Sequence, residues 1–279
     1  MPTLSDIVFY PVKSCAGISV AEALLTEAGL EVDGVCDREW MVVDQTGQFL
    51  TQREYPRMAL VTPRLNPGAL ELSAPGMPPH VIGRPAGGVT VGVHLWDDLV
   101  QADDCGDASA AWLAQAIGAP CRLVHFPAGA RRLTGTRWTG GIAAPTRFAD
   151  GYPVLVIGAA SLADINDKLV AAGRAALPMN RFRPNLVIDG IGAFEEDYVE
   201  AFTLGALSLK PVKPCPRCPI PSVDQATGIV GDDPLDILQA YRRKPQLDDA
   251  VCVGMNCIVT AGAGERLRVG QVIDAQLAF

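Results

Sequence analysis

Short runs of apolar or alternating residues dominate the first hundred positions of the chain. Turn-forming residues such as glycine, proline and asparagine separate these runs, which is typical of β-strands joined by tight connections. Their close spacing favours an antiparallel, barrel-like unit. The pattern predicts strands over residues 4–9, 39–44, 58–65, 69–73, 89–93 and 99–101, with turns at 46–47, 66–68 and 85–88.

One helix and one further strand are predicted behind these runs. Asp107 can cap the helix, apolar residues follow at helical spacing, and Gly118 can end it. Residues 121–126 have the apolar pattern of a strand. We therefore predict a first domain over residues 1–126.

The second half of the chain begins with an irregular segment, 127–150, rich in glycine. It is either a polar domain linker, which we favour, or a mobile lid. Beyond it, the pattern predicts strands over 154–157, 186–188, 201–204, 206–211, 252–260 and 267–277, and helices opening at Ser161 and Asp233. Ser161 and Asp164 resemble a capping box. We predict a second domain over 127–279 and a fold class of α+β, mostly β.

Composition limits the classes of function. Of the 279 residues, 49% are hydrophobic and 19% charged, which supports a packed core, and the net charge of -8 argues against nucleic-acid binding. The N-terminus lacks the features of a signal peptide, and no apolar stretch is long enough to span a bilayer. We therefore expect no membrane association and a cytoplasmic location, where cysteines are free thiols or ligands. Hydrolase and dinucleotide-binding motifs are absent from the sequence.

Two cysteines three positions apart lie in a proline-rich stretch. Cys215 and Cys218 are separated by Pro216 and Arg217, and prolines also flank the pair. Proline fixes the backbone and donates no hydrogen bond, so the stretch is predicted to be a stiff loop that presents thiols. Sulfur on a rigid loop beside a positive charge suits a metal ligand or a reactive thiolate.

Three kinds of chemistry fit this pair of thiols. Structural zinc needs four ligands, and the most plausible second pair, Cys252 and Cys257, is poorly spaced. A thioredoxin-like dithiol needs a helix after Cys218, where prolines follow instead. A single thiolate ligand to a soft metal held by a cofactor fits better, because one cysteine then suffices.

Basic and polar residues follow predicted strands elsewhere in the chain. Lys13 and Ser14 come after the first strand, where a lysine and a hydroxyl can grip a phosphate. Arg181 and Arg183 are two residues apart in extended backbone, so their guanidinium groups point to one side, beside Asn185. These groups indicate a site for a carboxylate or a phosphate.

Four blocks of sequence, in the same order, resemble the MOSC family with its N-terminal β-barrel companion domain. They are YPVKSCAG at 10–17, DREW at 37–40, RFRPN at 181–185 and CPRCPIPSVDQATG at 215–228. The resemblance covers nearly the whole chain. It implies an N-terminal β-barrel domain followed by a MOSC domain built on a mixed β-barrel with flanking helices.

The resemblance also implies a cofactor and its ligands. Members of the family bind the molybdenum cofactor, a molybdopterin with a terminal phosphate, and a protein cysteine is the additional metal ligand. That ligand corresponds to Cys218. By position in the motifs, the residues expected to contact the cofactor are Lys13, Ser14, Arg38, Arg181, Arg183 and Asn185, with Ser161 and Ser222 as weaker candidates.

The function implied is a molybdenum-dependent oxidoreductase that reduces small N-hydroxylated substrates such as amidoximes and hydroxylamines. Asp224 either delivers protons or, as we favour, orients the cysteine loop. No iron–sulfur domain follows the MOSC domain, so we expect a separate electron donor of iron–sulfur, flavin or haem type. The alternative is a non-catalytic carrier of the cofactor or of sulfur, with a persulfide on Cys215 or Cys218.

Overall fold

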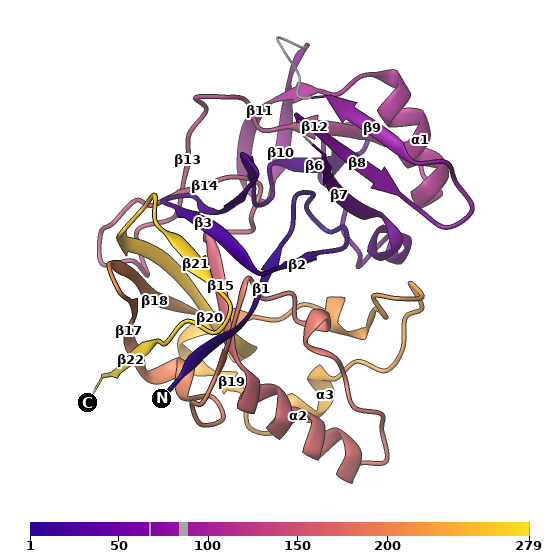
Figure 1. Cartoon of the computed structure of the whole chain (residues 1–279). Coiled ribbons are helices and arrows are strands. Elements are labelled where there is room, and N and C mark those ends of the chain that lie inside the picture. Colours follow the sequence, from indigo (N-terminus) through magenta and orange to yellow (C-terminus); the bar gives the residue numbers. More distant parts are fainter. Residues whose placement is uncertain (67, 84–88, 279) are drawn as a thin grey trace.

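The computed structural model describes residues 1–66, 68–83 and 89–278. The predicted turn at 85–88 and the proline of the turn at 66–68 lie outside the described residues. Two bodies lie one above the other in Figure 1: an upper one with strands β6 to β12 and α1, and a lower one with β1, most of the later strands, α2 and α3. Strands make up 41% of the chain and helices 17%, so the prediction of a mostly β fold is confirmed.

The lower body is organised around the largest sheet in the described part of the chain. Its strands β15 and β16 are parallel, and the other neighbours are antiparallel. Their order is β2 (Ile18–Val20), β1 (Thr3–Phe9), β16 (Leu186–Asp189), β15 (Val154–Gly158), β20 (Ala250–Ala261), β18 (Leu207–Pro216), β17 (Val199–Leu204) and β22 (Asp274–Leu277), with β19 (Arg243–Lys244) paired to β20.

Smaller antiparallel sheets form the rest of the structure. One contains β10 (Thr90–Leu95), β11 (Asp98–Asp104), β12 (Arg122–His125) and β6 (Trp40–Val43). A second contains β7 (Thr62–Asn66), β8 (Ala69–Ser73) and β9 (His80–Gly83), and a third β21 (Arg266–Arg268), β3 (Glu22–Thr26), β4 (Gly29–Val32) and β5 (Val35–Cys36). The pair β13 (Arg132–Leu133) and β14 (Pro145–Thr146) lies inside the segment expected to be irregular.

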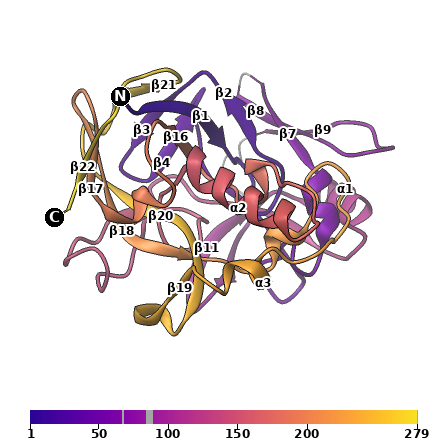
Figure 2. The same cartoon turned by 90° about the horizontal axis from the view of Figure 1, so that it is seen from below.

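Helices cover the sheets on their outer sides. Figure 2 shows α2 (Ala159–Ala171) and α3 (Leu235–Leu238) on the lower side of the molecule, and α1 (Asp107–Ile117) belongs to the upper body. Ile165 and Leu169 of α2 share a buried cluster with Leu238 of α3 and Val253 of β20. Short 3-10 turns complete the structure: η1 (Pro56–Leu60), η2 (Met179–Arg181), η3 (Glu195–Tyr198), η4 (Ile220–Ser222) and η5 (Pro245–Leu247). No helix in the described residues is long and apolar enough to cross a membrane.

Each half of the sequence contributes a strand to a sheet of the other half. β1 comes from the first half and pairs with β16 of the second, whereas β21, near the C-terminus, pairs with β3. The largest buried cluster accordingly combines side chains from both halves, among them Phe9, Trp40 and Phe202. The division at residue 126 stays a prediction, but this exchange fixes the relative positions of the segments that form the site.

The structure corrects three predicted elements. Residues 58–60 belong to η1, because Pro56 starts a 3-10 turn before β7 begins. The predicted strand 267–277 is divided into β21 and β22 by a turn in which Gly270 has a φ of 86°. Helix α2 begins at Ala159 with Gly158 as its N-cap, so Ser161 is not a capping residue.

The proline-rich stretch is also more regular than its sequence indicates. β18 continues through Cys215 to Pro216, paired with β20, so the first half of the predicted loop is a strand. Shifts in the register, at Pro211/Lys213 and at Pro214/Pro216, accommodate residues that cannot donate to a regular ladder. Cys215 therefore lies within the strand, and the chain leaves the strand after Pro216, before Cys218.

Candidate functional site

A cavity of about 470 Å³ lies where the N-terminal segments meet the ends of the large sheet. This volume is within the usual range for small-molecule and cofactor sites. Of the described residues that line it, six are cationic and one is a carboxylate, in a protein whose net charge is -8. The cationic side chains are Lys13, Arg38, Arg53, Arg183, Lys213 and Arg217, and the carboxylate is Asp150.

Three polar residues on the cavity wall have a left-handed backbone. Ser14, Arg38 and Arg183 have φ values of 63°, 50° and 55°. Such a conformation costs a residue with a side chain roughly 1–3 kcal/mol and persists only where the surrounding structure imposes it. Strain of this kind accumulates at binding sites, so it marks this wall as a candidate for function.

The ring of Tyr10 contacts both arginines of this wall. The guanidinium carbons of Arg38 and Arg183 each lie 4.4 Å from the centroid of its ring. Burial raises the pKa of the Tyr10 hydroxyl to about 12, against the opposing effect of both arginines, so the ring is neutral at physiological pH. The aromatic ring thereby holds two like charges close together around one cavity.

Asn185 and Asp37 fix the position of Arg38. The Arg38 guanidinium pairs with the Asp37 carboxylate and donates to Asn185 Oδ1 at 3.0 Å. Asn185 Oδ1 also accepts from the Leu155 N–H, and Asn185 Nδ2 donates to Asp37 Oδ1 at 3.1 Å and to the carbonyl of Val8. All four hydrogen-bonding positions of this amide are therefore used within the protein. The geometry gives Asn185 a positioning role.

Lys13 is buried and faces the end of the irregular segment. Its Nζ lies 2.5 Å from Asp150 Oδ1, and this carboxylate also accepts from Trp96 Nε1 at 3.1 Å. Burial lowers the pKa of the Lys13 ammonium, and the Asp150 carboxylate opposes that shift. Arg132 holds the segment in place by donating to the carbonyls of residues 147, 149 and 150. This end of the segment is thus part of the cavity wall.

Arg183 has no counter-ion among the described residues, unlike Lys13 and Arg38. Its side chain is 9% exposed, and within the described residues its guanidinium has neither a hydrogen bond nor an ion pair, although it stacks on Tyr10. Burial lowers the pKa of this guanidinium, although arginine keeps its charge at physiological pH. A buried, unpaired cation on a cavity wall is a strong candidate for binding an anionic ligand.

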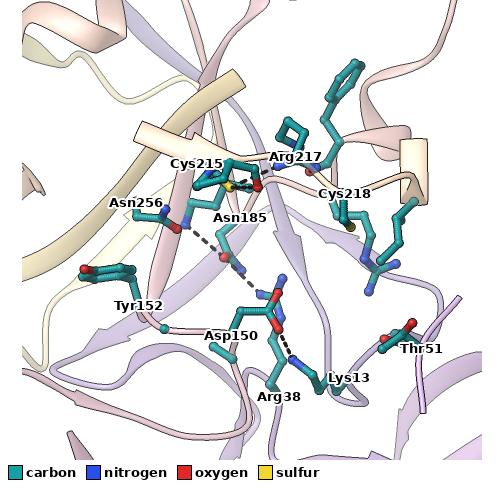
Figure 3. A pocket seen from close by; sticks show the side chains of 18 of the residues that line it. Lys13, Arg38, Thr51, Asp150, Tyr152, Asn185, Cys215, Arg217, Cys218 and Asn256 are labelled. Atoms are coloured by element: carbon teal, nitrogen blue, oxygen red, sulfur yellow. Dashed lines mark hydrogen bonds and ion pairs between the residues drawn. The ribbon is translucent and has the colours of Figure 1, made fainter. Parts of the chain in front are cut away.

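Both cysteines of the proline-rich stretch face this cavity. Cys215 and Cys218 are half-buried and line it, with Arg217 between them (Figure 3). Arg217 Nη1 donates to Cys215 Sγ at 3.2 Å, and its Nη2 donates to the Phe182 carbonyl at 2.7 Å. A charged donor at 3.2 Å suits a sulfur that carries negative charge.

The remaining cysteines lie outside the cavity lining. Burial raises the pKa to about 12 for Cys15, Cys36 and Cys105, to about 11 for Cys121 and Cys252, and further for Cys257. Thiols of this kind are unreactive. The described residues contain no group of three or more His, Cys, Asp or Glu side chains that could hold a metal ion. The structure therefore offers no support for the structural zinc site considered from the sequence.

Two other predicted site residues act on the cysteine loop from outside the cavity. Arg181 Nη2 lies 2.7 Å from Asp224 Oδ2, and Arg181 Nη1 donates to the carbonyl of Pro221. Asp224 Oδ1 accepts from the N–H groups of Ala226 and Thr227. Neither Arg181 nor Asp224 lines the cavity. These contacts fix the loop that carries Cys218. Orienting this loop is the role favoured for Asp224 from the sequence.

The two predicted serines are also outside the lining. Ser222 Oγ donates to the carbonyl of Pro219 at 2.5 Å, which closes the turn after Cys218. Ser161 Oγ donates to the Glu196 carboxylate at 2.7 Å and accepts from the N–H of Phe194. Both hydroxyls are engaged within the protein, so these residues have structural contacts in place of the expected cofactor contacts.

Several lining residues were not predicted from the sequence. Asp150, Tyr152 and Asn256 complete the wall near the two cysteines and Lys13. No local motif distinguishes them, although the charge of Asp150 at the end of a glycine-rich segment could have suggested an ionic partner. Lys213 lies two residues before Cys215, and its positive charge so close to the thiols could have marked it as a lining residue.

Comparison with known proteins agrees with this architecture. Family models describe residues 1–120 as a MOSC N-terminal beta barrel domain and residues 144–274 as a MOSC domain. Mitochondrial amidoxime reducing component 2 of Rattus norvegicus is 36% identical over 248 residues, 86% of this chain and 72% of the relative. Component 1 of Mus musculus and of Homo sapiens are each 34% identical, over 86% of this chain and 71% and 72% of their own lengths. The chain therefore belongs to the family of amidoxime-reducing components with MOSC domains.

Proposed function

We propose that the protein binds the molybdenum cofactor in this cavity and reduces N-hydroxylated compounds with electrons from a separate protein. The observation that carries the proposal is the convergence of two groups on one cavity. Cys218 presents a half-buried thiol, and Arg183 presents a buried cation without a counter-ion in the described structure. The names of the relatives, amidoxime-reducing components, support a reductive reaction associated with this cofactor.

The residues of the cavity fit this cofactor in chemical type. Its terminal phosphate is anionic, and the wall offers the cations of Lys13, Arg38 and Arg183 and the hydroxyl of Ser14. Its metal is soft enough to accept a thiolate, which Cys218 can supply. When bound, the cofactor supplies two-electron redox chemistry at its metal.

The chain itself contributes positioning, charge and a defined pocket. Asn185 and Asp37 hold Arg38, and the ring of Tyr10 contacts both Arg38 and Arg183. These contacts fix the charged groups before a ligand arrives, which reduces the cost of ordering them on binding. Asp224 orients the loop that carries Cys218 through its ion pair with Arg181.

The proposed reaction takes its two electrons from an external donor. For an amidoxime, two electrons and two protons cleave the N–O bond, and the products are an amidine and one water. The relatives are named components, which supports a system with more than one protein. We propose that the donor is an iron–sulfur, flavin or haem protein and that the chain works in the cytoplasm.

Turnover of a simple amidoxime tests the proposal. Protein from a host that makes the cofactor is supplied with a chemical one-electron donor and benzamidoxime. We expect one benzamidine for every two electrons consumed, with no product from Cys218→Ala. Absence of benzamidine from wild-type protein with full cofactor content would overturn the reaction. Equal turnover by Cys218→Ala would overturn the role of the thiol.

One observation favours a second candidate, the sulfur carrier. Cys215 also lines the cavity, beside Cys218, and receives a hydrogen bond from Arg217. A persulfide on Cys215 would carry the negative charge that this donor suits. Intact mass spectrometry of cofactor-free protein separates the two: an increase of one sulfur atom on Cys215 supports the carrier, and unmodified thiols argue against it.

A further inference from the structure

One side of the cavity carries polar groups that the proposed cofactor contacts do not use. Lys213 of β18 and Asn256 of β20 are directly paired in the sheet register, and both line the cavity. Cys215 lies two residues beyond Lys213 and lines it too. Met255 and Cys257, on either side of Asn256, are buried in the core. β18 and β20 therefore present an ammonium, an amide and a thiol to the same cavity.

This face lies across the cavity from two of the proposed cofactor cations, Lys13 and Arg38. Figure 3 shows Asn256 and Cys215 on one side of the cavity and Lys13 and Arg38 on the opposite side. The two sides also belong to different segments, since Lys13 and Arg38 come from the N-terminal half. The groups that Lys13 and Arg38 would bind therefore lie on the opposite side of the cavity from the β18–β20 face.

Lys213 is a half-buried cation without a counter-ion. Within the described residues its ammonium has no hydrogen bond and no ion pair, and the aromatic ring of Trp138 lies 5.9 Å from Nζ. Two other cations of the lining have anionic partners: Lys13 pairs with Asp150 and Arg38 with Asp37. A partly desolvated ammonium gains more from an anionic ligand than an ion pair exposed to water does.

Asn256 and Tyr152 add neutral donors to the same side. Neither the Asn256 amide nor the Tyr152 hydroxyl has a hydrogen bond within the described residues, and both side chains line the cavity. Figure 3 shows Tyr152 on the side of the cavity nearest Asn256. An ammonium and an amide N–H in adjacent strand positions provide two donors, which matches the two oxygens of a carboxylate.

We propose that Lys213 and Asn256 form a substrate-recognition wall that selects N-hydroxylated substrates bearing a carboxylate. The substrate class rests on the proposed function, whereas recognition of the carboxylate depends only on this wall. Lys213 and Asn256 bind the carboxylate and thereby hold the N-hydroxyl end in the region of Cys218. These two residues determine specificity and take no part in cleavage of the N–O bond.

A pair of substrates that differ in one carboxylate tests the wall. Benzamidoxime and 4-carboxybenzamidoxime are compared on wild type and on Lys213→Met, which keeps the length of the side chain and removes the charge. Lys210→Met is the matched control, because Lys210 is an exposed residue of the same strand outside the cavity lining. We expect kcat/KM for the carboxylated substrate to fall about tenfold or more in Lys213→Met. The neutral substrate should change less than about twofold, and Lys210→Met should change neither.

Binding measured without turnover separates this inference from the proposed function. Calorimetry compares 4-carboxybenzamidine with benzamidine on the same three proteins as purified. A preference for the carboxylate in wild type that disappears in Lys213→Met supports the wall, even if neither amidoxime is reduced and the proposed function fails. Equal affinities in wild type and Lys213→Met overturn it. Phenyl phosphate serves as a further probe, and binding of phosphate without binding of carboxylate overturns the assignment to carboxylates.

Discussion

Arg181 and Asp224 form an ion pair of 2.7 Å that lies outside the cavity and holds the loop carrying Cys218. Asp224 Oδ1 also caps the turn at Ala226 and Thr227, so one carboxylate joins two parts of this loop. The pair explains how an aspartate near the thiols affects the site without facing the reacting atoms. Variants of Asp224 can therefore distinguish its role in orienting the loop from a role in delivering protons.

Replacing Asp224 by asparagine keeps a side chain that can accept from the turn and removes the carboxylate. Because Asp224 orients the loop, we expect Asp224→Asn to retain turnover of benzamidoxime within about tenfold. Loss of a general acid typically costs about 100-fold or more. Steady-state kinetics across pH distinguish the two roles. A decrease of that size, with the pH dependence of turnover lost, would show that Asp224 delivers protons.

Asp224→Ala is the companion variant, because it removes the turn contacts as well as the charge. We expect it to lower the free energy of unfolding by about 0.5–1 kcal/mol more than Asp224→Asn, since the N–H groups of two exposed residues, Ala226 and Thr227, exchange this acceptor for water. Urea unfolding measures the difference. Equal stability of the two variants would contradict the capping role assigned to Asp224 Oδ1.

Arg183 is predicted to serve ligand binding at a cost in stability. Its guanidinium is buried without a counter-ion in the described structure and its backbone is left-handed. Arg183→Met removes the buried charge and keeps an apolar chain on Tyr10, so we expect an unchanged or higher Tm and a lower content of cofactor. Differential scanning calorimetry and pterin fluorescence measure the two quantities. A fall in Tm with normal cofactor content would show that Arg183 is structural.

Tyr10 is predicted to act through its ring and not through its hydroxyl. The hydroxyl is buried without a hydrogen-bond partner in the described structure, and an unpaired buried polar group is destabilising. We therefore expect Tyr10→Phe to be as stable as wild type or more stable, by up to about 1 kcal/mol, because both arginines still contact a ring. Denaturant unfolding at neutral pH measures this, and destabilisation by more than about 1 kcal/mol would contradict it.

The pH dependence of Tyr10 has a defined sign. Its pKa is raised from 10.0 to about 12 in the folded state, so between these values the folded protein binds more protons than the unfolded chain. The stability that this group contributes is fully present below pH 10 and is lost as the pH rises to 12. We expect the difference in unfolding free energy between Tyr10→Phe and wild type to grow in favour of phenylalanine over this interval. A constant difference would contradict the shift.

Local sequence predicted the β-rich fold and the chemistry of the site better than it predicted which residues meet. Lys13, Ser14, Arg38 and Arg183 were predicted from their charge and their position in motifs, and the structure brings all four to one cavity with Cys218. Ser161 was placed at a helix cap, but the N-cap is Gly158 and the Ser161 hydroxyl donates to Glu196. That contact joins residues 35 apart and has no local signal.

Strand register accounts for most of what was missed. The pairing of Lys213 with Asn256 depends on irregular shifts around prolines in β18, which the sequence pattern does not specify. The same shifts allow a strand to run through Pro214 and Pro216, where proline content predicted a loop. The role of Asn185 likewise depends on four partners from three other segments, all distant along the chain or across the fold.

The central claim is that the thiol of Cys218 binds the molybdenum of a cofactor held in this cavity. X-ray absorption at the molybdenum edge, on protein with measured metal and pterin content, tests it most directly with wild type, Cys218→Ser and Cys215→Ser. We predict molybdenum with pterin in wild type, one fewer sulfur ligand or loss of the metal in Cys218→Ser, and an unchanged metal site in Cys215→Ser. Wild-type protein without molybdenum from a host that makes the cofactor, or an unchanged sulfur shell in Cys218→Ser, would contradict it.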